Sequence, residues 1–384
     1  MKKPEDFDSM NRRDFLKIGA AGAAVASIGL SGVGNLLYAQ ASPEPVYRTL
    51  GRTGLKVTTL SFGAMLTPES EVIRAGLDMG INYVDTARRY LNGRSEGIVG
   101  KAVKGIRDKL YIATKTKPDS NTAEAIIKDV ETSLTELGTD RIDVIQLHNL
   151  DEPKRAFIPE VREAYLKLRK EGKVRFFGVT THTNQAEVID ALINDPDKFF
   201  DTVLVGYNMK TDPSVKQAIA RAKEAGLGIV AMKIQAAVRG PEAPTISPEQ
   251  SAAAFKWALQ DTNVSNVIAG MRTLEQIKNM FPVMGAKLIA ADELRVERYS
   301  AAIDKEFCRL CAKCEPTCPN GVRISIVNRA LMYAEAYREP GLARETIREV
   351  PSAALCANCA ECVARCVNGI SIAEKMRRAR ALYA

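Results

Sequence analysis

The sequence predicts an α/β protein in which a closed (β/α)8 TIM barrel is followed by a small α-helical domain. Eight short apolar segments recur at intervals of about 30 residues from Thr58 to Gly270, a spacing typical of repeated βα units. Amphipathic helical patterns lie between them. All eight cysteines come after residue 307, which sets the last part of the chain apart from the barrel.

Each barrel strand is expected at one of the apolar segments. A hairpin precedes them, because VYRTLGRTGLKVTTL, from Val46 to Leu60, predicts two short strands around a Gly-Arg-Thr-Gly turn. The eight strands are expected at TTLSFGA, YVDTA, LYIATK, DVIQLH, VRFFGVT, TVLVGYN, GIVAMK and SNVIAG. An open doubly wound sheet is the alternative. Such sheets usually carry GxGxxG after the first strand, where this chain has SFGAML.

Two of the intervening helices show clear sequence signals. TAEAIIKDVETSLTELG is apolar at positions i, i+3, i+4 and i+7, as one face of a helix requires. SPEQSAAAFKWAL begins with Ser247 and has Gln250 three residues later, which predicts a capping box with Pro248 in the first turn.

Composition indicates a soluble globular protein. Of the 384 residues, 46% are hydrophobic and 26% are charged, which is enough apolar side chain for a sizeable core. The formal charge is +8, but the basic residues are dispersed, so nucleic acid is not an expected partner. The nearest approach to a basic patch is KMRRAR, from Lys375 to Arg380. We expect a solvated helix face there, with docking to an acidic redox protein or a membrane surface as the alternative.

Residues 1–41 are predicted to be a twin-arginine export signal. NRRDFLK is followed by an Ala- and Gly-rich apolar stretch from Ile18 to about Leu37, and then by the small-x-small site Ala39-Gln40-Ala41. The mature protein would begin near Ser42 in the periplasm or another extracytoplasmic space. An uncleaved membrane anchor is the alternative, although membrane association is not expected.

Ionisable residues follow three successive strands. Asp85 ends YVD and Tyr90 lies five residues later in a polar loop, while Lys115 ends LYIATK and His148 ends DVIQLH. The carboxyl ends of parallel barrel strands open onto one face, so these side chains should converge there. A phenol with a pKa near 10 becomes a useful proton donor when a nearby cation favours its ionisation. Taken singly, each residue also has a purely structural interpretation.

The region from Val46 to Ala286 resembles the aldo/keto reductase family. The hairpin LGRTGLKV, the DTARRY loop, the strand-end lysine and histidine, and GVT followed by YN carry the resemblance. It implies that Tyr90 protonates a carbonyl oxygen as hydride arrives. Lys115 would lower the pKa of the phenol, Asp85 would hold the ammonium group, and His148 would orient the substrate oxygen.

The same resemblance implies a nicotinamide nucleotide at the carboxyl ends of the later strands. A helix N-cap at Thr273 would offer backbone N–H groups to a phosphate. Leu204 stands where the family usually has an amide, and Gly270 and Gln276 replace the basic pair that commonly holds a 2′-phosphate. These departures argue against a preference for NADPH and leave NADH or a permanently held nucleotide open. The residues implied in cofactor binding are Thr180, Thr181, Asn208, Met232, Lys233, Gly270, Arg272 and Gln276.

The cysteines form two runs of the same spacing, C-x2-C-x2-C-x3-C. This spacing is typical of two-cluster ferredoxins, in which three thiolates hold one [4Fe-4S] cube and the fourth ligates the other cube. Zinc and disulfides are the alternatives, but zinc more often uses separated CxxC pairs and the duplicated register argues against disulfides. The expected ligands are Cys308, Cys311, Cys314, Cys318, Cys356, Cys359, Cys362 and Cys366.

Together these features predict a barrel over residues 46–290 and an α-helical, ferredoxin-like two-cluster domain over residues 300–384. We expect an exported oxidoreductase that reduces a carbonyl or oxidises an alcohol, coupled to two [4Fe-4S] clusters and a redox partner protein. Two alternatives are an electron-transfer protein whose barrel only binds a partner, and a reductase whose clusters are purely structural.

Overall fold

The computed structural model describes residues 44–238, 245–350, 356, 359 and 361–382. The predicted export signal and the expected start of the mature protein near Ser42 lie outside these ranges. The described chain from Pro45 onward forms one compact unit.

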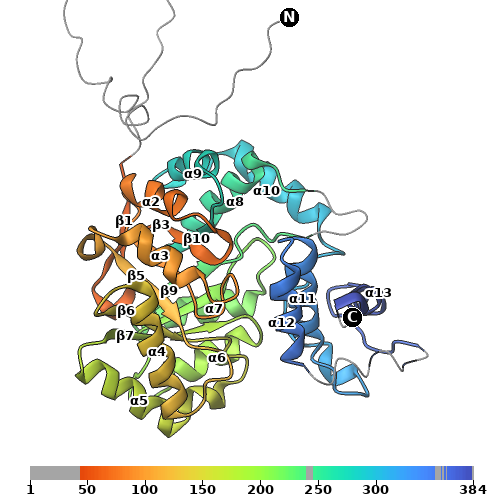
Figure 1. Cartoon of the computed structure of the whole chain (residues 1–384). Coiled ribbons are helices and arrows are strands. Elements are labelled where there is room, and N and C mark those ends of the chain that lie inside the picture. The colour runs from red at the N-terminus through yellow and green to blue at the C-terminus, as the bar shows by residue number, and fades with distance from the viewer. Residues whose placement is uncertain (1–43, 239–244, 351–355, 357–358, 360, 383–384) are drawn as a thin grey trace, which may run out of the picture. The chain divides into compact units, whose positions relative to one another are not determined.

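Eight parallel strands close into a barrel in the order β10-β3-β4-β5-β6-β7-β8-β9 (Figure 1). The last strand pairs with the first, with Val267 opposite Leu60. The predicted TIM barrel is therefore confirmed, and each of the eight predicted segments contains a strand. The strands are β3 (Leu60–Gly63), β4 (Tyr83–Asp85), β5 (Tyr111–Lys115), β6 (Ile142–Leu147), β7 (Val174–Thr181), β8 (Thr202–Gly206), β9 (Gly228–Met232) and β10 (Asn266–Gly270).

The predicted hairpin closes the amino end of the barrel. Strands β1 (Tyr47–Thr49) and β2 (Lys56–Thr58) are antiparallel, and Leu50 and Val57 belong to one buried cluster with apolar side chains of β4, β6 and β8. The hairpin approaches β9 so closely that a Cβ on Gly51 would lie 2.2 Å from the Gly228 nitrogen. The amino end is thus filled, which leaves the carboxyl ends of the strands as the place for a site.

Helices surround the barrel as the alternating pattern predicts. Helix α4 begins after the N-cap Thr122 and ends at Gly138 in the left-handed conformation, and α8 begins with the predicted capping box at Ser247 and Gln250. The barrel helices are α2 (Ser70–Asp78), α3 (Ser95–Val103), α4 (Ala123–Leu137), α5 (Pro159–Lys170), α6 (Gln185–Ile193), α7 (Pro213–Glu224), α8 (Pro248–Gln260) and α9 (Leu274–Met280).

The C-terminal part is helical, as predicted. A separate buried cluster, which includes Val327, Ile347 and Met376, holds its helices together. Helix α10 begins at the predicted domain limit and also contacts the barrel helix α8, because Lys256 donates to Asp292 at 2.9 Å. The limits at residues 290 and 300 therefore remain a prediction. The helices are α10 (Ala290–Ala302), α11 (Ile324–Glu335), α12 (Pro340–Arg348) and α13 (Ile372–Ala379).

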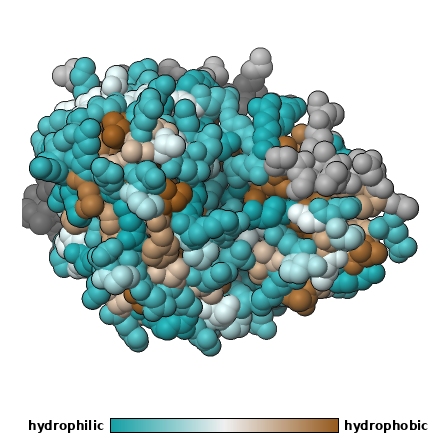
Figure 2. Space-filling view, turned by 90° about the horizontal axis from the view of Figure 1, so that it is seen from below, coloured by the Kyte–Doolittle hydropathy of each residue, from teal (hydrophilic) through white to brown (hydrophobic). Residues whose placement is uncertain are grey.

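The basic segment from Lys375 to Arg380 is only partly the predicted solvated face, since Arg377 and Arg380 are exposed but Lys375 and Arg378 are not. Lys375 is buried and pairs with Glu306, and Arg378 pairs with Glu306 and Glu335. These ion pairs fasten α13 to α11 and to the segment before the first cysteine. The face seen in Figure 2 is mainly hydrophilic, with hydrophobic residues in separate groups. Within the described ranges, no helix has the length and apolar content needed to cross a lipid bilayer.

Candidate functional site

Four of the sequence-predicted residues meet at the carboxyl end of the barrel. Asp85 is the last residue of β4, Lys115 is the last residue of β5, and His148 directly follows β6, while Tyr90 lies in the loop after β4. Because these strands are neighbours in the barrel, their side chains enter one region. We call this region the barrel mouth.

A buried ion pair forms its floor. The Lys115 ammonium donates to Asp85 Oδ1 at 2.5 Å and to the Thr86 carbonyl at 2.6 Å, and Gln146 donates to Asp85 Oδ2 at 3.0 Å. Lys115 and Asp85 are only 1% and 4% exposed. Burial lowers the pKa of Lys115, and the Asp85 carboxylate opposes that shift. The lysine is thus held in one position by a partner of opposite charge.

Removing the acid of this pair should destabilise the barrel. An Asp85→Asn variant leaves the buried ammonium without its counter-charge, so we expect about 3 kcal/mol lower unfolding free energy, measured by chemical denaturation. The matched control is Asp78→Asn, which removes an exposed pair with Arg74 and should cost less than about 1 kcal/mol. Equal losses in the two variants would contradict a specific role of the buried pair.

Tyr90 lies directly over the lysine. The Lys115 Nζ is 4.6 Å from the centre of the Tyr90 ring, and the His148 ring meets the same ring edge-on at a centroid distance of 6.0 Å. The pKa of Tyr90 is well above its usual value because the phenol is buried and because Asp85 is near. The expected lowering of this pKa is therefore not met in the closed site, where burial and Asp85 raise it. The phenol is therefore protonated at neutral pH.

His148 is neutral at the same pH. Burial lowers its pKa well below the usual value, and the cations of Lys115, Arg89 and Arg329 act in the same direction. Its Nδ1 atom is buried and has no hydrogen-bond partner among the described residues. The imidazole therefore has an unused nitrogen in the interior of the site.

Helices α11 and α12 of the C-terminal part cover the barrel mouth. Tyr333, Leu342 and Glu349 line one small cavity together with Tyr90 and His148. The cavity has a volume of about 30 Å3, which is room for roughly two water molecules. We call this the capped cavity, and no signal in the sequence indicated that these helices would close it.

Ion pairs fasten the two helices to the barrel. Arg89, next to Tyr90, binds Glu345 at 3.3 Å and Glu349 at 3.1 Å, and Arg272 binds Glu339 at 2.8 Å. The other arginine beside Tyr90, Arg88, pairs instead with the buried Glu96 in α3. Both arginines beside Tyr90 therefore form ion pairs within the protein.

The residues implied in nucleotide binding lie in two groups. Thr180 and Thr181 are buried at the end of β7, with Asn208 after β8, and Met232 and Lys233 come at the end of β9 beside the capped cavity. A second group lies after β10 and is exposed. It consists of Gly270, Arg272 and Gln276.

Their polar groups already have partners within the protein. The Thr180 hydroxyl accepts from the Asn149 N–H at 2.9 Å, and the Asn208 amide donates to the Lys233 carbonyl at 3.1 Å. Gln276 accepts from the Arg272 N–H at 2.6 Å. With the capped cavity as small as it is, the residues present do not fit a nicotinamide ring in this arrangement.

A larger cavity adjoins the capped one on the side of β7 and β8. It has a volume of about 210 Å3 and extends from Asn208 to Cys308 and Cys311 of the first cysteine run. His182 and Lys233 line both cavities. The first cysteine run and the barrel mouth therefore share one cavity wall.

The eight cysteines gather into two groups of four. The sulfurs that act electrostatically on Cys308 are those of Cys314, Cys311 and Cys366, and burial raises the pKa of Cys308 to about 12. On Cys356 the corresponding sulfurs are Cys359, Cys362 and Cys318. Each group thus takes three cysteines from one run and the fourth from the other, as a pair of [4Fe-4S] cubes requires. None of the eight takes part in a disulfide.

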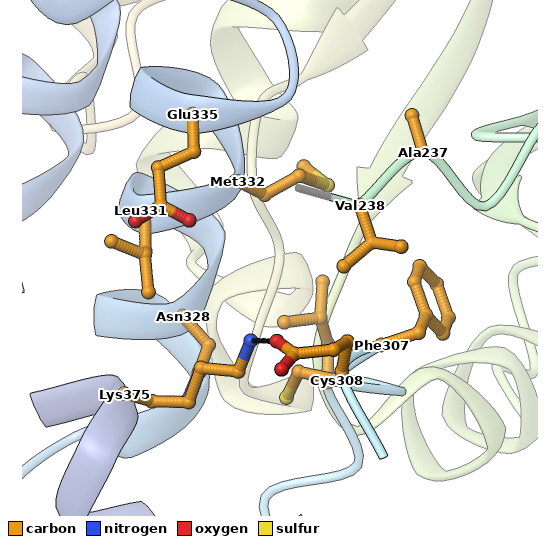
Figure 3. Close-up of a pocket in the computed structure, with 11 residues that line it drawn as sticks. Ala237, Val238, Phe307, Cys308, Asn328, Leu331, Met332, Glu335 and Lys375 are labelled. Carbon is orange, nitrogen blue, oxygen red and sulfur yellow. Dashed lines mark hydrogen bonds and ion pairs between the residues drawn. The ribbon is translucent and has the colours of Figure 1, made fainter. Parts of the chain in front are cut away.

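The first cysteine group lies against α11. Cys308 and Phe307 line a small cavity together with Leu331 and Met332 of α11, and the Glu306–Lys375 ion pair belongs to the same lining (Figure 3). Among the described residues, no three Cys, His, Asp or Glu side chains approach closely enough to hold a single metal ion. A cube is larger than one ion and takes thiolates spaced around it.

Comparisons with known proteins cover three successive segments of the chain. Residues 64–237 match the model of the Aldo/keto reductase family, residues 9–29 match the twin-arginine translocation pathway signal sequence, and residues 307–371 match the 4Fe-4S dicluster domain.

Individual relatives resemble most of the chain. L-galactose dehydrogenase of Arabidopsis thaliana is 26% identical, over 67% of this chain and 94% of its own. A solved aldo-keto reductase from Bacillus halodurans has a TM-score of 0.56 and 25% identity, covering 67% of this chain and 96% of that one. An aldo-keto reductase from Klebsiella pneumoniae, solved in complex with NADPH, has the same TM-score with 24% identity, over 66% and 95% of the two chains.

Proposed function

We propose that this chain, which belongs to the aldo/keto reductase family and carries a twin-arginine signal and a 4Fe-4S dicluster domain, interconverts a carbonyl and an alcohol in the barrel mouth. The observation that carries the proposal is the buried Lys115–Asp85 pair beneath the Tyr90 ring, with His148 at the edge of that ring. The signal directs export, and we propose the periplasm as the destination.

Each of the four residues has a distinct task in this proposal. The Tyr90 phenol, protonated at neutral pH, donates its proton to the carbonyl oxygen as the alcohol forms and takes it back in the reverse direction. The Lys115 ammonium lies 4.6 Å from the ring centre and stabilises the phenolate left behind, while Asp85 keeps the lysine in place. Neutral His148 offers a hydrogen bond that orients the substrate oxygen.

The C-terminal cysteines would hold two [4Fe-4S] clusters, one by Cys308, Cys311, Cys314 and Cys366 and the other by the remaining four. A pair of such clusters would supply two electrons one at a time, and the conversion of one carbonyl takes these two electrons with two protons, one from Tyr90 to the oxygen and one from water to the carbon. The first group shares a cavity with Lys233 and Asn208, so a cluster held by these cysteines would supply electrons beside the barrel mouth. A redox partner protein would exchange electrons with the second group.

The support for a nicotinamide nucleotide comes from the family and not from the geometry of the site. NADPH is bound in the Klebsiella pneumoniae relative, but here the capped cavity holds only about 30 Å3. A nucleotide would enter only with α11 and α12 displaced from the barrel, and we derive no step of the reaction from it. We therefore propose that a nucleotide, if it binds, is loaded before export, and that the site does not prefer NADPH.

A second function is favoured by the same cap. If the barrel mouth stays closed, the barrel serves as a scaffold and the protein carries electrons between partners without converting a substrate.

One experiment separates the two functions. The full chain is purified anaerobically, analysed for iron, sulfide and nucleotide, and then mixed, after reduction by dithionite, with a panel of small carbonyl compounds. Formation of alcohol, with oxidation of the clusters, is expected for the enzyme. If every carbonyl is recovered unchanged while the clusters still exchange electrons with an added acceptor protein, the scaffold function is correct.

A further inference from the structure

The last part of the chain carries exposed positive charge that no acid neutralises. Within the described residues from 340 to 382, every glutamate except Glu361 takes part in an ion pair inside the protein. Five arginines in the same range are exposed and form no ion pair with any described residue. They are Arg344, Arg348, Arg365, Arg377 and Arg380. We call these five the arginine rim.

Two residues of the rim hold the backbone of the second cysteine group. Arg365 donates to the Cys362 carbonyl at 3.1 Å, and Arg380 donates to the Cys356 carbonyl at 3.2 Å. Both side chains are nevertheless exposed, so part of each guanidinium stays open to solvent beside the cysteines. A guanidinium has five N–H donors, of which these bonds use only a part.

The other three residues of the rim lie on α12 and α13. Arg344 and Arg348 are four apart on α12 and therefore share one face of that helix, and Arg377 lies three residues before Arg380. Helix α12 packs against the segment from Arg380 to Leu382. The rim therefore continues from the second cysteine group onto both helices.

Apolar side chains are exposed at the same place. Val363 and Val367 are 50% and 66% exposed, and they stand two residues before and two residues after Arg365. The apolar faces of the helices are already used, because Ile347 of α12 and Met376 of α13 pack into the buried cluster of the C-terminal part. Contact surfaces between proteins commonly combine apolar residues with a polar rim, and arginine is enriched in them.

The two cysteine groups lie in different surroundings. Cys308 and Cys311 of the first group line the cavity that leads to the barrel mouth. In the second group, Cys359 accepts from the exposed Asn320 at 3.0 Å, and Cys362 is followed by the exposed Val363. The first group therefore faces the barrel, and the second group lies at the surface that carries the arginine rim.

We propose that this surface docks an acidic protein that carries single electrons, with Val363 and Val367 in the contact and the partner's carboxylates on the arginine rim. The inference rests on the proposed function, because it names the surface and the charge of the redox partner proposed there. A guanidinium offers a carboxylate two parallel hydrogen bonds, and charges of opposite sign speed the encounter of two proteins. The exchange itself moves one electron and makes or breaks no bond.

Two other roles for the arginines predict different results. Loaded clusters are negatively charged through their thiolates, so Arg365 and Arg380 would offset that charge, but the other three arginines form no hydrogen bond with a described residue. A membrane of anionic lipids is the second alternative. Binding to it usually requires an apolar helix face, and those of α12 and α13 are packed inward.

The test uses the anaerobically purified full chain, reduced by dithionite and freed of excess reductant, with two haem proteins as acceptors. Cytochrome b5 is acidic and cytochrome c is basic, and stopped-flow absorbance follows the reduction of their ferric haem. We expect the second-order rate constant with cytochrome b5 to fall at least about 10-fold between about 0.02 and 0.5 M salt. The rate constant with cytochrome c should stay level or rise.

Charge reversal at the rim gives the second part of the test. Arg348→Glu/Arg377→Glu changes two side chains that bond to no described residue, so the iron content should equal that of wild type. At about 0.1 M salt we expect the rate constant with cytochrome b5 to fall by about 10- to 100-fold, and that with cytochrome c to rise. Calorimetry should show the same weakening of cytochrome b5 binding, which needs no electron transfer.

The matched control is Lys167→Glu/Lys170→Glu. It reverses two exposed lysines of α5 that form no ion pair with a described residue, and it should change either rate constant by less than about 3-fold.

Several results would overturn the inference. Equal salt dependence with both acceptors would do so, and so would a rim variant that changes both rate constants in the same direction, since the arginines then act on the cluster and not on the partner. Binding of wild type to vesicles of phosphatidylcholine and phosphatidylglycerol, lost in the rim variant and without preference between the cytochromes, would assign the rim to a membrane.

Failure of the proposed function gives a different result. Purified protein without iron would contradict the clusters themselves, whereas protein with both clusters that ignores the charge of its acceptor contradicts only the docking surface. Charge-selective electron transfer in a protein that converts no carbonyl would leave the docking surface intact and contradict the enzyme.

Discussion

Replacing Tyr90 with phenylalanine should lower kcat for carbonyl reduction by about 10²- to 10⁴-fold, the usual contribution of a general acid. The variant keeps the ring over Lys115 and against His148, so the packing of the site is preserved and only the transferable proton is lost. The loss should appear in kcat, while KM changes little, because the hydroxyl acts on the oxygen that gains charge during the reaction. Steady-state kinetics of the full chain with its clusters loaded measures both.

Tyr111→Phe is the matched control for this experiment. Tyr111 is the first residue of β5 and Lys115 is the last, so the two lie at opposite ends of the strand. Removing the Tyr111 hydroxyl should therefore leave kcat unchanged. A Tyr90→Phe variant that retains the wild-type rate would show that another group supplies the proton.

Exchanging single cysteines for serine should reveal the crossed ligation of the two clusters. Cys366→Ser and Cys308→Ser should damage the same cluster, although the two residues lie at opposite ends of the domain sequence, because both sulfurs belong to one group of four. Cys318→Ser should damage the other cluster, with Cys356. Each variant is expected to lose up to about four of roughly eight iron atoms per chain, and the paramagnetic resonance spectrum of the remaining cluster identifies which one was lost.

This prediction is decided by which variants have the same paramagnetic resonance spectrum. If Cys366→Ser resembles Cys356→Ser and differs from Cys308→Ser, each cluster is held by one run and the grouping of the sulfurs is wrong. Loss of zinc in place of iron would contradict the clusters altogether.

The barrel was predictable because its signals are local and repeated. Each strand is a short apolar segment, and polar residues such as Asp85 and Lys115 fall where the segments stop, so their convergence follows from parallel strands in one barrel. The helix start at Ser247 was equally predictable, since a capping box depends on the residues next to it.

The cover over the barrel mouth was not predictable, because it depends on contacts between residues far apart in the sequence. Arg89 and Glu349 are separated by 260 positions, so no local pattern connects them. The pKa of Tyr90 was misjudged for a related reason: the sequence supplied the lysine, but the effect of burial and of Asp85 requires the assembled site.

The nucleotide residues show a different limit. Thr180, Asn208 and Gln276 were assigned by resemblance, and in the structure each already bonds to a neighbouring residue. A family pattern places such residues near a cofactor in its other members, but whether a polar atom is free depends on the side chains around it, here including those of α11 and α12.

The central claim is that the tetrad under the helical cap converts a carbonyl with electrons from the C-terminal clusters. Its most direct test follows the paramagnetic resonance signal of the dithionite-reduced full chain after excess reductant is removed and a small carbonyl compound is added anaerobically. The account predicts that the signal of wild-type protein disappears with formation of the alcohol, and that it persists in Tyr90→Phe. Clusters that stay reduced with every carbonyl, or that lose their electrons equally fast in both proteins, would contradict it.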